Sequence, residues 1–175
     1  MSDKNEQSEN DRIDVAVMMG SKSDLETMRP ASRALEALGL KVEMRVLSAH
    51  RTPDETAAFV KEAVRRGVKA FICGAGGAAH LAGAVAAHTT RPVIGVPIAA
   101  GSLGGLDALL STAQMPPGMP VATVAVGGAE NAGLLAGQII ALGDEAVAAR
   151  VEAERLARRK KVLESDAEVR GERKR

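Results

Sequence analysis

Aromatic side chains are almost absent from this sequence, which contains two Phe and neither Trp nor Tyr. Proteins that hold single-stranded nucleic acid stack its bases on aromatic rings, and this chain offers no such platform. The formal net charge of +1 gives no overall field that would attract a polyanion. We therefore expect no nucleic-acid partner.

Cysteine is also scarce, because Cys73 is the one cysteine in 175 residues. A single thiol excludes an intrachain disulfide and any site that binds a metal through several cysteines, and it fits a reducing compartment. No stretch resembles a signal peptide or a membrane span. These observations predict a cytoplasmic protein with no membrane partner and no metal site.

Short apolar runs alternate with segments of helical period along most of the chain. The apolar runs are nearly continuous, which is typical of a parallel sheet that helices cover on both faces. We predict strands at residues 13–19, 41–47, 70–73, 93–96 and 121–126. The repeated strand-helix order predicts an α/β fold with a doubly wound parallel sheet in three αβα layers.

The length of the chain suits one domain that can bury a sizeable core. We predict a flexible N-terminal arm at residues 1–12, a single α/β catalytic domain at 13–143, and an extra C-terminal helix with a charged tail at 144–175. Val147, Val151 and Leu156 lie among many charges in that last segment. The helix either presents a solvated face or packs on a neighbouring subunit.

Several residues indicate where the first two helices begin and end. Ser23 and Thr52 are each followed by Glu three residues later, which is the spacing of a capping box. Gly39 and Gly67 fit the C-terminal caps of the same helices. Pro30 lies inside the first helix, where it should remove a hydrogen bond and produce a kink.

Glycine, hydroxyl groups and titratable groups follow each of the first three predicted strands. These segments are GSKSD at 20–24, SAHRTPD at 48–54 and GAGGAAHLAG at 74–83. In an open α/β sheet, ligands bind at the carboxyl ends of the strands, near the point where the strand order reverses. We expect the three segments to converge there.

The first segment places the hydroxyls of Ser21 and Ser23 beside the free amides of a helix N-terminus, which suits an anion. Simple capping by Ser23 is the alternative. The Gly-x-x-x-x-Gly-Lys pattern of a Walker A loop is absent. A carboxylate at Asp24 would repel phosphate, but it can bind the hydroxyls of a sugar.

The second segment adds Arg51, which can contact phosphate through two parallel hydrogen bonds, and His50, which can transfer a proton near neutral pH. Taken singly, Arg51 can equally be a surface charge and His50 a capped loop histidine. Together with the first segment, they predict a site for a sugar phosphate that includes a proton-transfer group.

The third segment satisfies Gly-x-Gly-x-x-Ala, the fingerprint of dinucleotide-binding loops. That fingerprint needs an acidic residue about twenty positions further on to bind ribose. Residues 63–106 contain neither Asp nor Glu. The sequence therefore disfavours a dinucleotide-binding module.

These segments, with VIGVP, LDALLSTAQMPPGMPVATVAVG and ENAGLLA, resemble class I PurE, the N5-carboxyaminoimidazole ribonucleotide mutases of purine biosynthesis, over residues 15–142. The related class II enzymes, which carboxylate aminoimidazole ribonucleotide directly, have Lys where Arg51 stands. The chain departs from the family at Ala82, where Pro is usual, and at Cys73, where Ala is usual. The resemblance implies a flavodoxin-like fold and a homo-oligomer, an octamer in the family.

The resemblance also implies roles for the residues of the first two segments. Ser21 and Arg51 would hold the 5′-phosphate of the ribonucleotide substrate, with help from Ser23 and Ser48. Asp24 would bind the ribose hydroxyls. No organic cofactor and no metal ion are implied.

The implied reaction removes the N5-carboxylate as carbon dioxide and adds it to ring carbon C4, with His50 as the proton shuttle. His80 would orient the carboxylate or stabilise the loop, and a purely structural role remains the alternative. Carbon dioxide must be confined rather than gripped, and a loop of small residues with free amides suits this. The implied substrate-binding residues of this loop are Gly74, Ala75, Gly76, Gly77, Ala78 and Leu81.

Two further functions stay open at this point. One is direct carboxylation of aminoimidazole ribonucleotide with carbon dioxide. The other is a non-catalytic module that binds a nucleotide in the same cradle.

Overall fold

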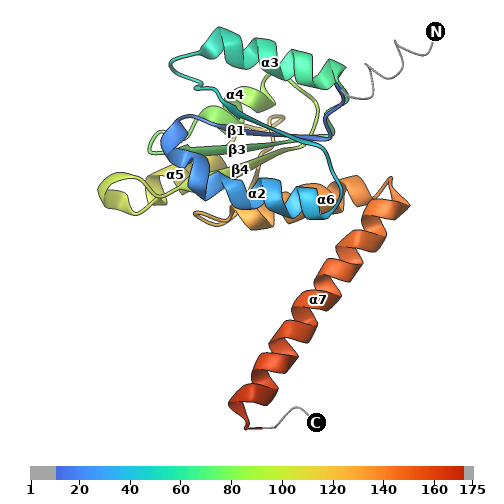
Figure 1. Ribbon diagram of the computed structural model, residues 1–175. Helices are drawn as coiled ribbons and strands as arrows, with labels where there is room; N and C mark the ends of the chain where they lie inside the picture. Colours follow the sequence, from blue (N-terminus) through green and yellow to red (C-terminus); the bar gives the residue numbers. More distant parts are fainter. Residues whose placement is uncertain (1–10, 172–175) are drawn as a thin grey trace, which may run out of the picture.

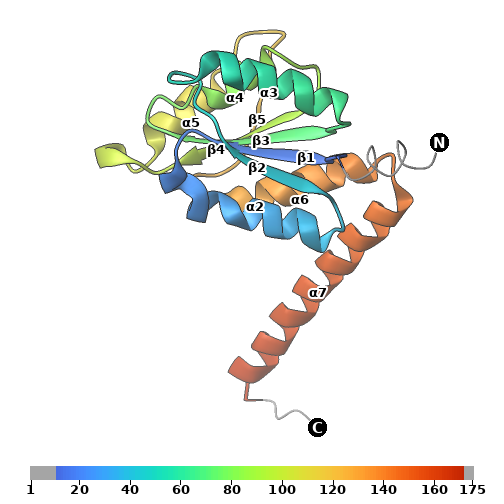
Figure 2. The ribbon, with the colours of Figure 1, turned by 45° about the horizontal axis from the view of Figure 1, so that its top comes forward.

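The computed structural model describes residues 11–171 and contains one five-stranded sheet. The strands lie in the order β2-β1-β3-β4-β5, and every neighbouring pair is parallel (Figure 2). Their bounds are β1 (Val15–Met19), β2 (Val42–Val46), β3 (Ala70–Gly76), β4 (Val93–Ile98) and β5 (Ala122–Thr123). This is the flavodoxin-like order, so the predicted fold class is confirmed.

The last strand is much shorter than predicted. Residues 121–126 read as a strand, but β5 pairs only at Ala122 and Thr123, which lie opposite Ile94 and Gly95 of β4. An edge strand has a single hydrogen-bonding neighbour, so its length depends on how far that neighbour follows it. Apolar pattern alone does not contain this information.

Helices cover both faces of the sheet, as the sequence predicts. Figure 1 shows α3 (Pro53–Arg65) and α4 (Leu81–Ala86) on one face, and α2 (Leu25–Ala37) and α6 (Ala129–Ala141) on the other. Helix α5 (Leu106–Ala113) packs beside β4. The arrangement is the three-layer αβα sandwich.

The strands divide their buried side chains between two apolar cores. Val15 and Val17 of β1 face α2 and α6, whereas Ala16 and Met18 face α3 and α4. Every side chain of β1 is at most 1% exposed. Alternate residues of a strand point to opposite faces, so a central strand covered on both faces must be apolar throughout.

The scarcity of aromatic residues is matched by close packing between α2 and α6. Gly133 of α6 lies so near α2 that a Cβ atom there would be 2.6 Å from the carbonyl oxygen of Ala31. Ala132 and Ala136 of the same helix are fully buried. Small residues thus let the two helices share one layer without large side chains between them.

Two helix starts differ from the predicted capping boxes. The N-cap of α2 is Asp24, while Ser21 caps a short 3₁₀ turn, η1 (Lys22–Asp24), by accepting a hydrogen bond from the amide of Ser23. Thr52 does occupy the N-cap position of α3, but its hydroxyl makes no capping bond. Both predicted capping boxes are therefore wrong. The Ser23 hydroxyl bonds to Ser21 and Asp24, and the Thr52 hydroxyl bonds to Ser48.

Other predicted boundaries are confirmed. Gly39 and Gly67 follow α2 and α3 with φ of +72° and +91°, a conformation that glycine adopts without strain. Pro53 lies in the first turn of α3, where its missing N–H is harmless. Helix α2 runs through Pro30 without ending there.

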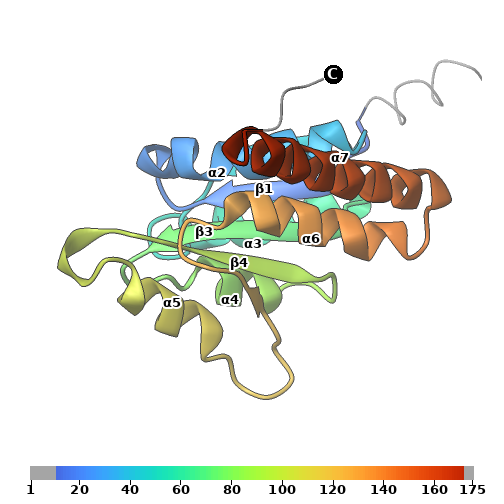
Figure 3. The same ribbon diagram turned by 90° about the horizontal axis from the view of Figure 1, so that it is seen from below.

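The predicted extra C-terminal helix is present as α7 (Glu145–Val169), which begins with Asp144 accepting a hydrogen bond from the amide of Val147. Val147 is buried, and Arg158 pairs with Glu130 of α6 at 2.6 Å. Figure 3 shows the start of α7 next to the end of α6, and Figures 1 and 2 show the rest of α7 extending away from the sandwich. Leu156 and the residues after it are mostly exposed, so the first turns hold the helix to the domain.

Most of the predicted N-terminal arm lies outside the described residues, as do residues 172–175 of the tail. At the end of the arm, the carbonyl of Asp11 accepts a hydrogen bond from Arg66 at 2.8 Å. Within residues 11–171, no helix is long and apolar enough to cross a membrane.

Candidate active site

The carboxyl ends of β1, β2 and β3 surround a cavity of about 450 Å³. The strand order reverses between β1 and β3, so the chain leaves β1 toward α2 on one face and leaves β3 toward α4 on the other. Such a reversal opens a crevice at the sheet edge. The three segments that the sequence singled out do converge there.

Most of the predicted site residues line this cavity, and a few positions were missed. The predicted residues that line it are Ser21, Asp24, Ser48, His50, Arg51, Ala75, Gly76, Ala78, His80 and Leu81. The residues that sequence reasoning missed are Gly20, Ala49 and Ala100. Gly20 and Ala49 lie inside the segments already singled out, whereas Ala100 follows β4 and carries no polar group that could have marked it.

Three predicted site residues lie outside the lining. Gly74 is a buried residue of β3, and a Cβ there would collide with the side chain of Met28 from α2. Ser23 is exposed and bonds to its neighbours in η1. Gly77 has φ of +61°, so it serves the turn after β3. Packing and turn geometry account for the two glycines.

Arg51 links the segment after β1 to the segment after β2 at one side of the cavity. Its Nη2 donates to the carbonyl oxygen of Gly20 at 2.6 Å, and its Nε donates to Oγ of Ser48 at 3.4 Å. No carboxylate pairs with Arg51 among the described residues. The guanidinium is therefore held in place while its charge stays uncompensated, which suits an anionic group.

Ser21 lines the same cavity as Arg51. Its oxygen accepts hydrogen bonds from the amide of Ser23 at 3.3 Å and from the hydroxyl of Ser23 at 2.9 Å. The Ser23 hydroxyl also lies 3.2 Å from Oδ1 of Asp24, so Ser21, Ser23 and Asp24 form one hydrogen-bonded group at the edge of the cavity.

His50 and His80 form a direct hydrogen bond across the cavity. Nε2 of His50 lies 2.8 Å from Nδ1 of His80, and the two rings are nearly perpendicular at 86°. One nitrogen must donate and the other accept, so the pair shares one proton between these two atoms. The residues are 30 positions apart, and no sequence pattern signalled the contact.

Small residues form the remaining wall. A Cβ on Gly76 would lie 2.9 Å from Cβ of Ala100 and 3.1 Å from the carbonyl oxygen of Ile98. The last residue of β3 therefore approaches β4 and the segment after it as closely as glycine allows. Burial raises the pKa of the Cys73 thiol in the strand below, so this sulfur stays protonated.

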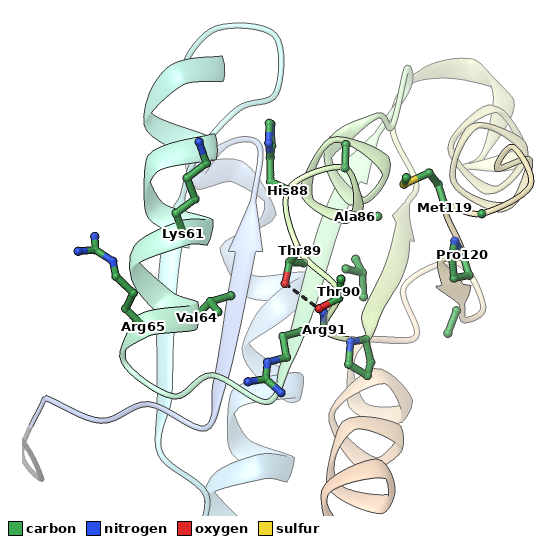
Figure 4. A pocket seen from close by; sticks show the side chains of 15 residues that line it. Lys61, Val64, Arg65, Ala86, His88, Thr89, Thr90, Arg91, Met119 and Pro120 are labelled. Carbon is green, nitrogen blue, oxygen red and sulfur yellow. Dashed lines mark hydrogen bonds between the residues drawn. The ribbon is translucent and has the colours of Figure 1, made fainter.

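A larger cavity of about 1070 Å³ lies elsewhere, between α3, α4 and the segment before β5 (Figure 4). Its basic side chains are Lys61, Arg65, His88 and Arg91. Figure 4 shows Lys61, Arg65 and Arg91 pointing in different directions rather than toward one point. The basic side chains of this larger cavity do not converge on one point, so its size alone does not make it a candidate reaction site.

No three His, Cys, Asp or Glu side chains within residues 11–171 are grouped so that they could hold a metal ion. The chemistry available in the smaller cavity is thus an anion cradle, a carboxylate at Asp24 and a pair of imidazoles.

Comparison with known proteins shows the family of the chain. Residues 14–161 match the family model described as AIR carboxylase. The N5-carboxyaminoimidazole ribonucleotide mutase of Brucella melitensis is 54% identical over 154 residues, covering 87% of this chain and 95% of that protein. The mutase of Bacillus subtilis is 50% identical over 157 residues, covering 89% and 97%.

A solved structure gives the same result for the fold. The crystal structure of Treponema denticola PurE superposes with a TM-score of 0.79 at 30% sequence identity, covering 88% of this chain and 96% of that one. The chain therefore belongs to the AIR carboxylase family.

Proposed function

We propose that this chain is a mutase of purine biosynthesis that converts N5-carboxyaminoimidazole ribonucleotide to 4-carboxyaminoimidazole ribonucleotide. Relatives with this name are about half identical over nearly their whole length. The observation that carries the proposal is the hydrogen-bonded pair of His50 and His80 beside the uncompensated charge of Arg51 in one cavity. A proton-transfer group thus stands next to a cradle for phosphate.

In this proposal Ser21 and Arg51 hold the 5′-phosphate, and Ser48 supports Arg51. Arg51 supplies charge and planar donors, Ser21 supplies a hydroxyl, and Ser48 keeps the guanidinium in place. Asp24 accepts hydrogen bonds from the ribose hydroxyls. This explains why a carboxylate lies in an anion cradle, since it faces the sugar and not the phosphate.

The reaction exchanges one carbon–nitrogen bond for one carbon–carbon bond. The bond between N5 and the carboxylate breaks, carbon dioxide is released into the cavity, and N5 gains a proton. C4 then attacks the carbon dioxide and loses its proton, which restores the aromatic ring. The net change moves a carboxylate one way and a proton the other, so no oxidant or cofactor is required.

His50 carries the proton in this scheme. Its Nε2 is occupied by the bond to His80, which leaves Nδ1 for proton exchange with the substrate. His80 keeps the His50 ring in one orientation and lets the charge of a protonated His50 spread over two rings. The small walls formed by Gly76, Ala78 and Ala100 confine carbon dioxide beside C4.

Direct carboxylation of aminoimidazole ribonucleotide is the second candidate, because the matching family model carries the description AIR carboxylase. Arg51 favours the mutase, since the class II carboxylases have Lys there. The test compares product formation from the N5-carboxylated substrate with that from aminoimidazole ribonucleotide and carbon dioxide. Faster turnover of the latter would overturn the mutase proposal, and binding without turnover of either would indicate a nucleotide-binding module.

The chain is also proposed to form a homo-octamer in the cytoplasm. Support for association comes from an exposed apolar face on and before α5, where Leu103, Leu106 and Leu110 are 61%, 56% and 48% exposed. The sequence holds one cysteine and so no intrachain disulfide, which fits a reducing compartment. Light scattering at micromolar concentration tests the assembly, and an active monomer would contradict it.

A further inference from the structure

The turn between β2 and α3, residues 48–52, carries both His50 and Arg51. The His50 ring is exposed, and its one hydrogen bond among the described residues is with His80. Its position therefore depends on the backbone of the turn.

One hydroxyl holds the two ends of this turn together. Oγ1 of Thr52 accepts a hydrogen bond from the amide of Ser48 at 2.8 Å and donates one to the carbonyl oxygen of Ser48 at 3.1 Å. The amide of Thr52 also donates to that carbonyl at 2.9 Å. Both backbone groups of Ser48 are thereby fixed to Thr52.

This arrangement replaces the ordinary use of such a hydroxyl. Thr52 is the N-cap residue of α3, and its side chain would usually accept a bond from an amide in the first turn. It makes no such bond here. The Thr52 hydroxyl instead bonds to Ser48, at the start of the turn that carries His50.

A second threonine supports the first from within the core. Thr56 is 2% exposed, and its Oγ1 donates to the carbonyl oxygen of Thr52 at 2.7 Å. Helix α3 therefore anchors Thr52, Thr52 anchors Ser48, and Oγ of Ser48 accepts hydrogen bonds from Arg51. The chain of contacts leads from a buried side chain to the cavity.

We propose that Thr52 is a positioning residue whose hydroxyl sets where His50 and Arg51 stand, with Thr56 as its buried support. The effect on turnover rests on the proposed mutase function. The effect on the geometry of the histidine pair does not, because that pair exists without substrate. The two consequences can be measured separately.

The test compares three variants. Thr52→Val keeps the branched shape and removes the hydroxyl, and Thr52→Ser restores the hydroxyl. Thr112→Val is the matched control, since the Thr112 hydroxyl also donates to a backbone carbonyl, that of Ala108 at 2.7 Å, and is buried away from this turn. We expect kcat to fall on the order of 10- to 100-fold in Thr52→Val, because small misplacements of reacting groups have effects of this size.

We expect Thr52→Ser to stay within about threefold of the unmodified protein and Thr112→Val to lose no turnover, since each preserves the turn. The second readout is the ring NMR spectrum of histidine-labelled protein without substrate. Signals of His50 and His80 should move in Thr52→Val, while the signal of His88 should not. If the unmodified protein turns over and Thr52→Val matches it in kcat and in these signals, the proposal is wrong.

Two remaining outcomes are also decisive. If the unmodified protein shows no mutase activity, the proposed function fails, and the His50 and His80 signals alone decide whether Thr52 positions them. If Thr52→Val does not fold, Thr56→Val replaces it, because that variant keeps the Thr52 hydroxyl and removes the Thr56 hydroxyl, which contacts the carbonyl oxygens of Thr52 at 2.7 Å and Ser48 at 3.4 Å. It should then lower kcat several-fold and move the same signals, and unchanged values would overturn the proposal.

Discussion

Replacing each histidine of the pair separately should give two different kinetic results. His50→Asn removes the group proposed to carry the proton, while an amide at that position still bonds to its neighbours. General acid–base catalysis is typically worth about 10²- to 10⁴-fold. We expect His50→Asn to lose at least this much turnover.

The binding of substrate should change much less. The one side-chain hydrogen bond that His50 makes among the described residues is the 2.8 Å contact with His80, which is exposed. Such a hydrogen bond contributes about 0.5–1.5 kcal/mol of net free energy, so its loss changes an equilibrium constant by about tenfold or less. His80→Asn keeps His50 and loses the bond that orients it, so we expect its turnover to fall about tenfold, the low end of the range expected for Thr52→Val. The two variants should therefore differ by about tenfold or more in turnover.

Single-turnover rates with the N5-carboxylated substrate separate chemistry from product release, and direct binding measurements on the same proteins give the affinity. Near-normal turnover in His50→Asn would refute the assignment and move the proton to His80 or to a bound water. Equal losses in both variants would refute the division of roles and indicate that the pair acts as one unit.

Three further predictions test the cradle, the helix layer and the buried thiol. Arg51→Ala should weaken substrate binding by about 2 kcal/mol or more, with Arg51→Lys between it and the unmodified protein, and an unchanged preference for the 5′-phosphate would show that Arg51 is not its ligand. Gly133→Ala should lower the free energy of unfolding by about 1–3 kcal/mol, because its Cβ would meet the backbone of α2. Gly137→Ala in the same helix meets a movable side chain and should cost less, so equal melting temperatures would contradict this. Burial raises the pKa of Cys73, so a thiol reagent at pH 9 should modify it only after urea unfolding, and rapid labelling of the folded protein would disprove this.

Local features of the sequence were enough to predict the fold class and the place of the site. Continuous apolar runs indicated covered parallel strands, and Gly39 and Gly67 marked helix ends because their positive φ is a local requirement. The polar segments after three strands indicated the cavity, since the carboxyl ends of parallel strands share one edge. Each of these inferences depends on residues close together in the chain.

The contacts that give the site its chemistry were decided by the tertiary structure. The sheet order places β1 between β2 and β3, and this brings Arg51 to the carbonyl of Gly20 and His50 to His80. The same hydroxyl that predicted a capping box at Thr52 instead holds the turn that carries His50 and Arg51. The need for glycine at position 74 comes from the side chain of Met28 on α2, a contact that no local pattern indicates. The spacing of apolar residues along the chain indicates whether a segment forms a helix or a strand. Which residue a side chain contacts depends on which helices and strands pack together.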